Sequence, residues 1–276
     1  MEYRIPRPEH FDAAQIFGCG QCFRFEQTDE QTYEGVAHGF YLRVRQTENE
    51  ITLFCPEEKD TFALWSEFFD FNTDYADMAR SFRDDPVLMD AARFSRGIRL
   101  LKQDPWETLC SFIISQNNNI PRIKGIIRAL SERYGREVFR DEKGRAFYSF
   151  PSAQSLYSAG ADALYAMKTG FRARYLADAA KTVCENPFFL TEVRGLPTAR
   201  AAEKLKAICG VGDKVAACTL LFGFSRYDAF PVDVWVKRVL DTYYPDGPSA
   251  PLAGSYAGLA QQYLFYFERC RNNVYV

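Results

Sequence analysis

The sequence predicts an α+β fold, with an antiparallel sheet domain over residues 1–100 and an all-helical domain over residues 101–276. Residues 33–54 alternate apolar and polar side chains and are rich in Val, Tyr, Phe, Ile and Thr, which is typical of antiparallel strands joined by a hairpin. Beyond residue 104 the apolar residues recur at helical spacing instead. A glycine-bearing turn between two helical segments, within residues 205–233, is the most distinctive feature of the second part.

Length and composition are those of a globular protein. The chain has 276 residues, of which 47% are hydrophobic and 25% charged, enough for one large domain or two ordinary ones. No run of about 18 apolar residues occurs, so we expect no membrane span. The N-terminal stretch MEYRIPRPEHFD is charged and lacks an apolar core, so we expect no export signal and an intracellular protein.

The charge is distributed unevenly along the chain. The formal net charge is −2, but residues 1–100 contain 11 Lys and Arg against 19 Asp and Glu, a balance of −8. The remaining residues contain 23 basic against 17 acidic side chains, a balance of +6. Any surface that binds phosphate is therefore expected in the second part.

Eight cysteines are spread through the sequence, and free thiols are expected where no export signal is present. Cys19 and Cys22 form a CxxC motif, which occurs in redox and zinc sites. No second CxxC is present, and His10 and His38 are the only histidines, so a four-ligand site is hard to build. We expect neither a metal nor an organic cofactor.

Two helices are predicted on either side of a run of asparagines. Residues 104–107, DPWE, combine the N-cap aspartate, first-turn proline and third-position glutamate of a helix start. This helix is apolar nearly all round to about Ser115, so we expect it to be buried. Three consecutive asparagines follow at 117–119, where they favour a turn, and the next helix begins at about Pro121.

Residues 205–233 read as a helix, a glycine-bearing hairpin, a second helix, a loop and an aspartate that opens a third helix. Gly210 and Gly212 bracket Val211, and glycine permits positive φ or a close approach of other groups. The first amide groups of a helix from about residue 213 would be free to bind a phosphate oxygen.

Lys214 lies in the first turn of that helix, and Asp233 follows a Pro-Val pair at a position suited to an N-cap. A lysine amine and a capping carboxylate in one cleft suit imine chemistry at a sugar carbon. The stretch resembles the helix–hairpin–helix with Gly-Pro-Asp loop of the base-excision DNA glycosylases, although Cys209 replaces the usual proline. The resemblance implies that Lys214 and Asp233 are catalytic and that residues 210–212 bind DNA phosphate.

Residues 17–25, FGCGQCFRF, resemble the Gly-Gln-Ser-Phe-Arg-Trp segment of the eukaryotic-type 8-oxoguanine DNA glycosylases. In that family the glycine matching Gly20 offers its carbonyl to the N7 hydrogen of the damaged base, which guanine lacks. A site that hydrogen-bonds a group rejects the analogue without it far better than a site based on shape alone. Without the resemblance, Gly20 would equally be a bend in the chain.

Further residues of the predicted lesion pocket lie late in the chain. Cys218 is one helical turn after Lys214, and residues 256–265 resemble the last helix of the family. There, the cysteine and the phenylalanine matching Phe265 pack on opposite faces of 8-oxoguanine, and the glutamine matching Gln261 bonds its Watson–Crick edge. Taken singly, Cys218 and Phe265 would be core residues, but together with Gly20 they favour a pocket for a flipped base.

Two segments resemble those that contact the base opposite the lesion. In SFIISQNNNIPRI, Asn117 and Arg122 match family residues that bind the cytosine left behind. In GFRARY, Phe171 replaces the tyrosine that wedges into the duplex, and Arg172 matches a second cytosine contact. From the residues alone, Asn117 would cap a helix, Arg122 would be solvated, and Phe171 and Arg172 would open a helix.

The resemblance runs from about Arg4 to the C-terminus. It implies a monomeric, bifunctional 8-oxoguanine DNA glycosylase and AP lyase that acts opposite cytosine in duplex DNA, without a cofactor. It also implies that a TATA-binding-protein-like sheet domain packs on the helical domain. One departure is Trp235, where the family commonly has a histidine that contacts phosphate, because an indole cannot carry charge.

Two alternative functions remain open from the sequence. A related helix–hairpin–helix glycosylase could remove oxidised pyrimidines or adenine, but Cys218 and Gly20 argue against it, as does the absence of the cysteine cluster typical of the endonuclease III branch. A non-catalytic DNA-binding module could use the hairpin only for phosphate, but Lys214 and Asp233 argue against that.

Overall fold

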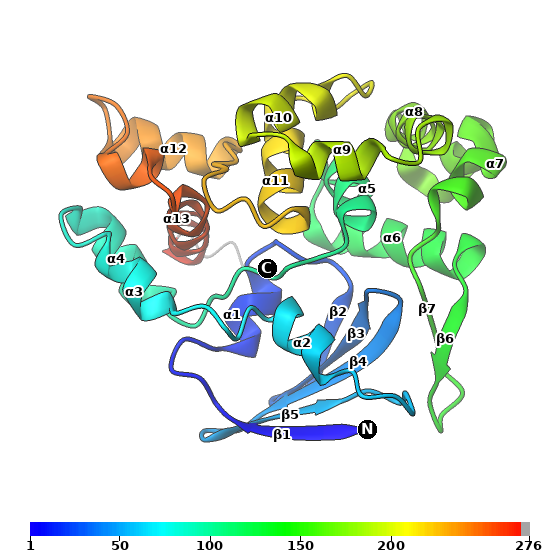
Figure 1. The fold of residues 1–276 in the computed structure, drawn as a ribbon, viewed down its shortest axis with the longest axis horizontal. Helices are drawn as coiled ribbons and strands as arrows, with labels where there is room; N and C mark the ends of the chain where they lie inside the picture. The colour runs from blue at the N-terminus through cyan, green and yellow to red at the C-terminus, as the bar shows by residue number, and fades with distance from the viewer. Residues whose placement is uncertain (272–276) are drawn as a thin grey trace.

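A computed structural model describes residues 1–271 and has a five-stranded antiparallel sheet on one side of a group of helices (Figure 1). The α+β class predicted from the sequence is confirmed. No helix among the described residues is long and apolar enough to cross a membrane.

The sheet has the strand order β1-β5-β4-β3-β2. Its strands are β1 (Glu2–Pro6), β2 (Phe25–Asp29), β3 (Thr32–Ala37), β4 (Phe40–Gln46) and β5 (Glu50–Phe54). The alternating stretch thus contains three strands, and the tight turn between β3 and β4 uses positive φ at His38 and Gly39. The strand β4 alternates between buried and exposed residues from Leu42 to Arg45, whereas β3 is buried along its whole length because helices and a ribbon cover it.

The helices before the hairpin are α1 (Ala13–Gly18), α2 (Phe62–Phe68), α3 (Tyr75–Arg80), α4 (Pro86–Phe94), α5 (Pro105–Ser115), α6 (Ile120–Tyr134), α7 (Ala153–Leu164), η1 (Tyr165–Thr169), α8 (Arg172–Glu185), α9 (Phe189–Gly195) and α10 (Thr198–Lys206). Those after it are α11 (Asp213–Gly223), α12 (Val234–Tyr243), η2 (Ala250–Ala253) and α13 (Ala257–Arg271). The predicted start of α5 is confirmed, since the Asp104 carboxylate accepts a hydrogen bond from the Glu107 amide at 2.9 Å.

Two hydrophobic clusters form the interior. One lies between the sheet and α1 and α2, around Phe17, Trp65 and Phe68. The other fills the helical part and includes residues of α3 and of α4, and α4 packs beside α13 (Figure 1). The division of the chain at residue 100 therefore stays a prediction, because residues 75–94 share their core with the helices that follow.

A buried polar junction joins the two parts. The guanidinium of Arg99 is 3% exposed and donates hydrogen bonds to the carbonyls of His10, Phe69, Asp70 and Thr73. The buried Asp70 carboxylate accepts hydrogen bonds from Tyr75 of α3 and Tyr227 of the α11–α12 loop, and it pairs with Lys102 at 3.0 Å. Each charge is therefore compensated, as burial requires.

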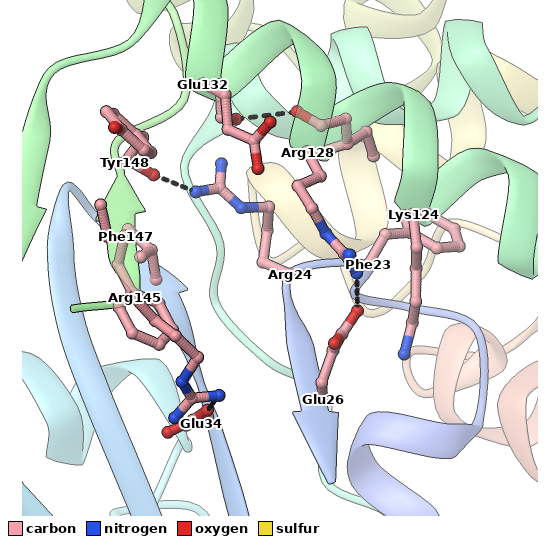
Figure 2. A pocket seen from close by; sticks show the side chains of 14 residues that line it. Phe23, Arg24, Glu26, Glu34, Lys124, Arg128, Glu132, Arg145, Phe147 and Tyr148 are labelled. Carbon is pink, nitrogen blue, oxygen red and sulfur yellow. Dashed lines mark hydrogen bonds and ion pairs between the residues drawn. The ribbon is translucent and has the colours of Figure 1, made fainter. Parts of the chain in front are cut away.

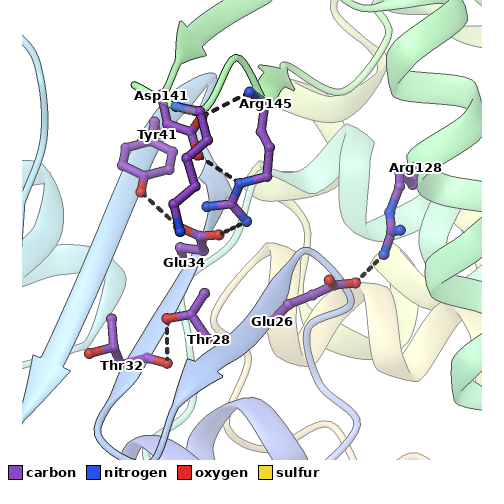
Figure 3. A network of polar contacts seen from close by, with 9 residues as sticks. Glu26, Thr28, Thr32, Glu34, Tyr41, Arg128, Asp141 and Arg145 are labelled. Atoms are coloured by element: carbon purple, nitrogen blue, oxygen red, sulfur yellow. Dashed lines mark hydrogen bonds and ion pairs between the residues drawn. The ribbon is translucent and has the colours of Figure 1, made fainter.

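A second connection is a two-stranded ribbon, β6 (Glu137–Arg140) and β7 (Ala146–Tyr148), which extends from the helical part along the sheet (Figure 1). Sequence reading gave only a charged loop here. The rings of Phe139 and Phe147 pack on Tyr41 of β4, with centroids 4.2 and 4.7 Å away. Arg145 pairs with Glu34 of β3 at 2.6 Å (Figure 3).

A cavity of about 370 Å³ lies beneath this ribbon, between β2, β3 and α6. Figure 2 shows Arg24 and Glu26 entering it from the sheet side and Lys124 and Arg128 from α6. Each of these cations has a protein acceptor: Arg24 the Tyr148 carbonyl, Lys124 the Phe25 carbonyl, and Arg128 the Glu26 carboxylate. These contacts connect the two parts of the chain and leave no cation in the cavity without a partner.

We predict that Arg99→Gln lowers the free energy of unfolding by about 3 kcal/mol, because several buried carbonyls lose their donor. The matched control is Arg93→Gln, which removes an exposed arginine paired only with Asp90 and should change stability by less than about 0.5 kcal/mol. Urea denaturation measures both. Equal effects of the two substitutions would show that the buried junction does not stabilise the fold.

Candidate active site

A cleft of about 730 Å³ lies where the sheet part meets the helical part. Its walls come from the loop after α1, the end of α5 and the asparagine run, α11, the loop before α12, and α13. Seven of the residues predicted from the sequence line it: Gly20, Asn117, Lys214, Cys218, Asp233, Gln261 and Phe265. Segments distant in sequence thus converge on one site.

Lys214 enters the cleft from the first turn of α11, which begins after Gly212. Its Nζ donates a hydrogen bond to Ser115 Oγ at 2.9 Å, at the end of α5, and lies 4.9 Å from the ring centroid of Phe112. The amine is half-buried between a hydroxyl and an aromatic face. One polar partner thus fixes its direction, and no carboxylate forms an ion pair with it among the described residues.

Asp233 is the N-cap of α12, as the sequence predicted. Its Oδ1 accepts hydrogen bonds from the amides of Trp235 at 3.0 Å and Val236 at 2.9 Å. These hydrogen bonds fix the direction of the carboxylate at the N-terminus of α12. Trp235 also lines the cleft, and the guanidinium of Arg238 lies 4.7 Å from its ring.

Cys218 is buried beneath these two charged groups, with 4% of its surface exposed. Burial raises the pKa of its thiol to about 11, partly offset by the Lys214 ammonium and reinforced by the Asp233 carboxylate. The side chain is therefore a neutral thiol at physiological pH. Such a group presents a polarisable, uncharged surface to whatever occupies the cleft.

Gly20 lies in a loop that is held from two sides. Its φ is +76°, a conformation that strains residues with a Cβ. The buried Gln21 side chain donates to the Arg99 carbonyl at 2.8 Å and accepts from the Leu101 amide at 2.9 Å. From the other side, Gln262 of α13 donates to the Cys19 carbonyl at 3.0 Å.

The helix α13 presents Gln261 and Phe265 to the same cleft. Phe265 Cε1 lies 3.5 Å from the position that a Cβ on Gly20 would occupy. Gln261 is 4% exposed, and its Oε1 has no hydrogen-bond partner among the described residues. A buried acceptor without a donor is costly, which is typical of an atom that a ligand satisfies.

Asn117 is exposed at the edge of the cleft with a φ of +46°. Arg172 is 2% exposed and holds this turn, because its guanidinium donates to the carbonyls of Gln116 and Asn117 and to that of Thr169. Arg122 is exposed and reaches the Lys168 carbonyl at 3.5 Å. Neither arginine lines the cleft, so their predicted cytosine contacts stay predictions.

The hairpin and Phe171 also lie outside the cleft but are joined to each other through Tyr175. Gly210 has a φ of +79°, and a Cβ there would lie 2.2 Å from the Tyr175 ring. Only glycine fits this position, since both its conformation and its space exclude a side chain. Phe171 is 42% exposed, with its ring centroid 5.8 Å from that of Tyr175.

Phe112, Ser115 and Arg269 are among the residues of the cleft that sequence reading missed. Nothing in the local sequence separates the first two from buried residues of an apolar helix. Arg269 does have a signal, because it follows Gln261 by eight residues and Phe265 by four, at helical spacing on the same face.

Comparison with known proteins agrees with this geometry. Residues 4–109 match the family model "8-oxoguanine DNA glycosylase, N-terminal domain", and residues 110–251 match "HhH-GPD superfamily base excision DNA repair protein". The N-glycosylase/DNA lyase OGG1 of Arabidopsis thaliana is 31% identical over 281 residues, which covers 91% of this chain and 76% of that protein.

Solved structures extend the similarity to the whole fold. MBOgg1, in complex with a low-affinity DNA ligand, superposes with a TM-score of 0.91 at 35% identity, covering 98% of this chain and 96% of its own. The 8-oxoguanine glycosylase/lyase of Clostridium acetobutylicum, bound to DNA with cytosine opposite 8-oxoguanine, gives 0.89 at 35% identity and covers 98% of both chains. The chain therefore belongs to the HhH-GPD superfamily of base excision DNA repair proteins and carries the N-terminal domain of the 8-oxoguanine DNA glycosylases.

Proposed function

We propose that the protein removes 8-oxoguanine opposite cytosine from duplex DNA and then cleaves the strand at the resulting site. The observation that carries this proposal is the convergence of Lys214, Asp233, Cys218 and the Gly20 loop on one cleft. The protein would act as a monomer in the compartment that holds the DNA, since one chain supplies all of these groups.

Lys214 is the proposed nucleophile. As the free amine, it attacks C1′ of the damaged nucleotide with its nitrogen lone pair, and the C1′–N9 bond breaks with its electron pair moving to the base, which then takes up a proton. Asp233 stabilises the positive charge that develops on the sugar. Opening of the sugar ring then gives an imine between Lys214 and C1′, with a proton transferred to the ring oxygen. Loss of a C2′ proton expels the 3′ phosphate by β-elimination.

The base would flip into the pocket between Cys218 and Phe265. The Gly20 carbonyl would accept the N7 hydrogen found in 8-oxoguanine, and the unpartnered Gln261 Oε1 would accept from the Watson–Crick edge. Flipping costs a few kcal/mol of stacking and pairing. The pocket contacts and phosphate binding at Gly210, Val211 and Gly212 would offset it.

The opposite strand would meet Asn117, Arg122, Arg172 and Phe171. The exposed Phe171 ring would wedge into the duplex beside the cytosine. Arg172 would act through the Asn117 turn, since its guanidinium donates hydrogen bonds to the carbonyls of that turn.

Two other functions compete with this proposal. One is the excision of oxidised pyrimidines or adenine, as by a related glycosylase, and the other is DNA binding without catalysis. Each predicts a different result in a covalent trapping experiment, because only an imine on the correct damaged nucleotide can be reduced to a stable link.

We predict that borohydride traps the protein on a duplex that contains 8-oxoguanine opposite cytosine, and that Lys214→Gln abolishes trapping. The control is Lys237→Gln, which changes another lysine at the cleft and should leave the covalent band. Binding without trapping or base release would favour the binding module, and trapping only on an oxidised pyrimidine would refute the pocket assignment.

We predict that Asp233→Asn slows base release by about 100-fold or more, since it removes a charge that stabilises the reacting sugar. Asparagine is a good N-cap, so α12 should remain intact and the thermal midpoint nearly unchanged. Single-turnover kinetics on 8-oxoguanine opposite cytosine measures the rate. A rate close to that of the native protein would contradict the assigned role.

We predict that Asn117→Gly reduces the preference for cytosine over adenine opposite the lesion by about 10-fold, the effect of losing one base contact. Glycine accepts the positive φ at this position, so the substitution removes the amide without straining the turn. Base release is compared on the two duplexes. An unchanged ratio would show that Asn117 does not read the opposite base.

A further inference from the structure

Three arginines are buried among the described residues: Arg99, Arg172 and Arg269. The first two donate hydrogen bonds to several backbone carbonyls each. Arg269 is 7% exposed, yet no hydrogen bond or ion pair within residues 1–271 satisfies its guanidinium, and its Nε has no partner. A buried donor without an acceptor is costly, which is typical of a group whose acceptor is supplied by a ligand in the cleft.

The position of Arg269 shows where such an acceptor would lie. The residue lines the same cleft as Lys214 and Asp233, and its guanidinium stacks 5.1 Å from the ring centroid of Phe265. Its Nη1 is 3.6 Å from where a Cβ on Gly20 would be. The cation is thus beside Gly20 and Phe265, at the part of the cleft assigned above to the base.

The charged groups near Arg269 leave its guanidinium available to a ligand in the cleft. Burial lowers the pKa of Arg269 and the nearby Asp233 carboxylate raises it, while an arginine stays protonated at physiological pH in either case. Asp233 forms no ion pair with it, and that carboxylate is engaged by the amides of α12. Arg269 therefore places a positive charge in the wall of the cleft.

The chemistry of the damaged base matches this arrangement. In 8-oxoguanine, the N7 hydrogen and the C8 carbonyl are adjacent, so the lesion edge presents one donor beside one acceptor. The Gly20 carbonyl is suited to the donor, and a guanidinium next to Gly20 is suited to the acceptor. Guanine has a C–H in place of that carbonyl and offers no acceptor there.

We propose that Arg269 donates a hydrogen bond to the C8 oxygen of the flipped 8-oxoguanine and stabilises the base as it leaves. This inference rests on the proposed function. When the C1′–N9 bond breaks, the electron pair moves to N9 and is shared with the adjacent C8 carbonyl, so negative charge grows on that oxygen. A fixed cation there binds the departing base more strongly than the bound substrate, which accelerates base release.

The test separates base release from strand cleavage. Arg269→Leu removes the charge and the donors, and Arg269→Lys keeps the charge but loses the planar fork. The matched control is Arg271→Leu, an exposed arginine on the same helix whose guanidinium also lies 5.2 Å from a phenylalanine ring, that of Phe267. Each variant is assayed for single-turnover release of 8-oxoguanine opposite cytosine and for β-elimination at a preformed abasic site.

We expect Arg269→Leu to slow base release by about 30-fold, the effect of losing a charged hydrogen bond. Cleavage of the abasic duplex should change by less than about twofold, because that substrate has no base, and Arg269→Lys should be intermediate. In a Lys214→Gln background, the preference for binding 8-oxoguanine over guanine should also fall.

Other outcomes overturn the proposal in distinguishable ways. If both reactions slow together, Arg269 maintains the cleft and does not act on the base; if only abasic cleavage slows, it serves the sugar or phosphate. If Arg269→Leu matches Arg271→Leu in both assays, the guanidinium has no role in the reaction. Failure of the native protein to release 8-oxoguanine while Lys214 still traps another lesion would refute the proposed substrate instead.

Discussion

The rest of the site depends on how the Gly20 loop is fixed at the junction of the two parts of the chain. Gln21 joins the loop to residues 99–101, and Gln262 joins it to α13. Because these amides are buried and hydrogen-bonded, a shift of the loop would leave several polar groups unsatisfied. The Gly20 loop is therefore held beside Phe265, and the pocket exists before any ligand arrives.

The same principle recurs at the outer edge of the site. Asn117 and Gly210 both have positive φ, which strains Asn117 but which glycine adopts readily. Arg172 compensates at the first position through hydrogen bonds to the turn, and Tyr175 packs against the second. One helix, α8, thus supports both the turn that carries Asn117 and the hairpin. The residue assigned to the opposite base and the residues assigned to DNA phosphate are therefore held by the same helix.

The basic excess after residue 100 serves two kinds of contact, one with the acidic sheet and one with DNA. The basic excess after residue 100 was interpreted as a phosphate-binding surface, but part of it faces the acidic sheet. Arg128 pairs with Glu26, and Arg145 pairs with Glu34 beside the cavity under the ribbon. Net charge along a sequence does not reveal which charges face each other. Because some basic side chains pair with the sheet, only the remaining ones are available to DNA.

The sequence by itself determined the elements and motifs whose signals are local. The N-cap at Asp104, the glycine hairpin, Lys214 in the first turn of α11 and the capping Asp233 all follow from neighbouring residues, because capping and turn conformations depend on them. Only the tertiary structure decided that α3 and α4 join the helical core and that the ribbon spans to the sheet. It also decided that Arg172 is buried on carbonyls while Arg269, equally basic in sequence, lies buried beside Phe265 with no acceptor for its Nε among residues 1–271. The physical reason is that desolvation and hydrogen-bond satisfaction depend on which distant segments meet, and no local pattern encodes that.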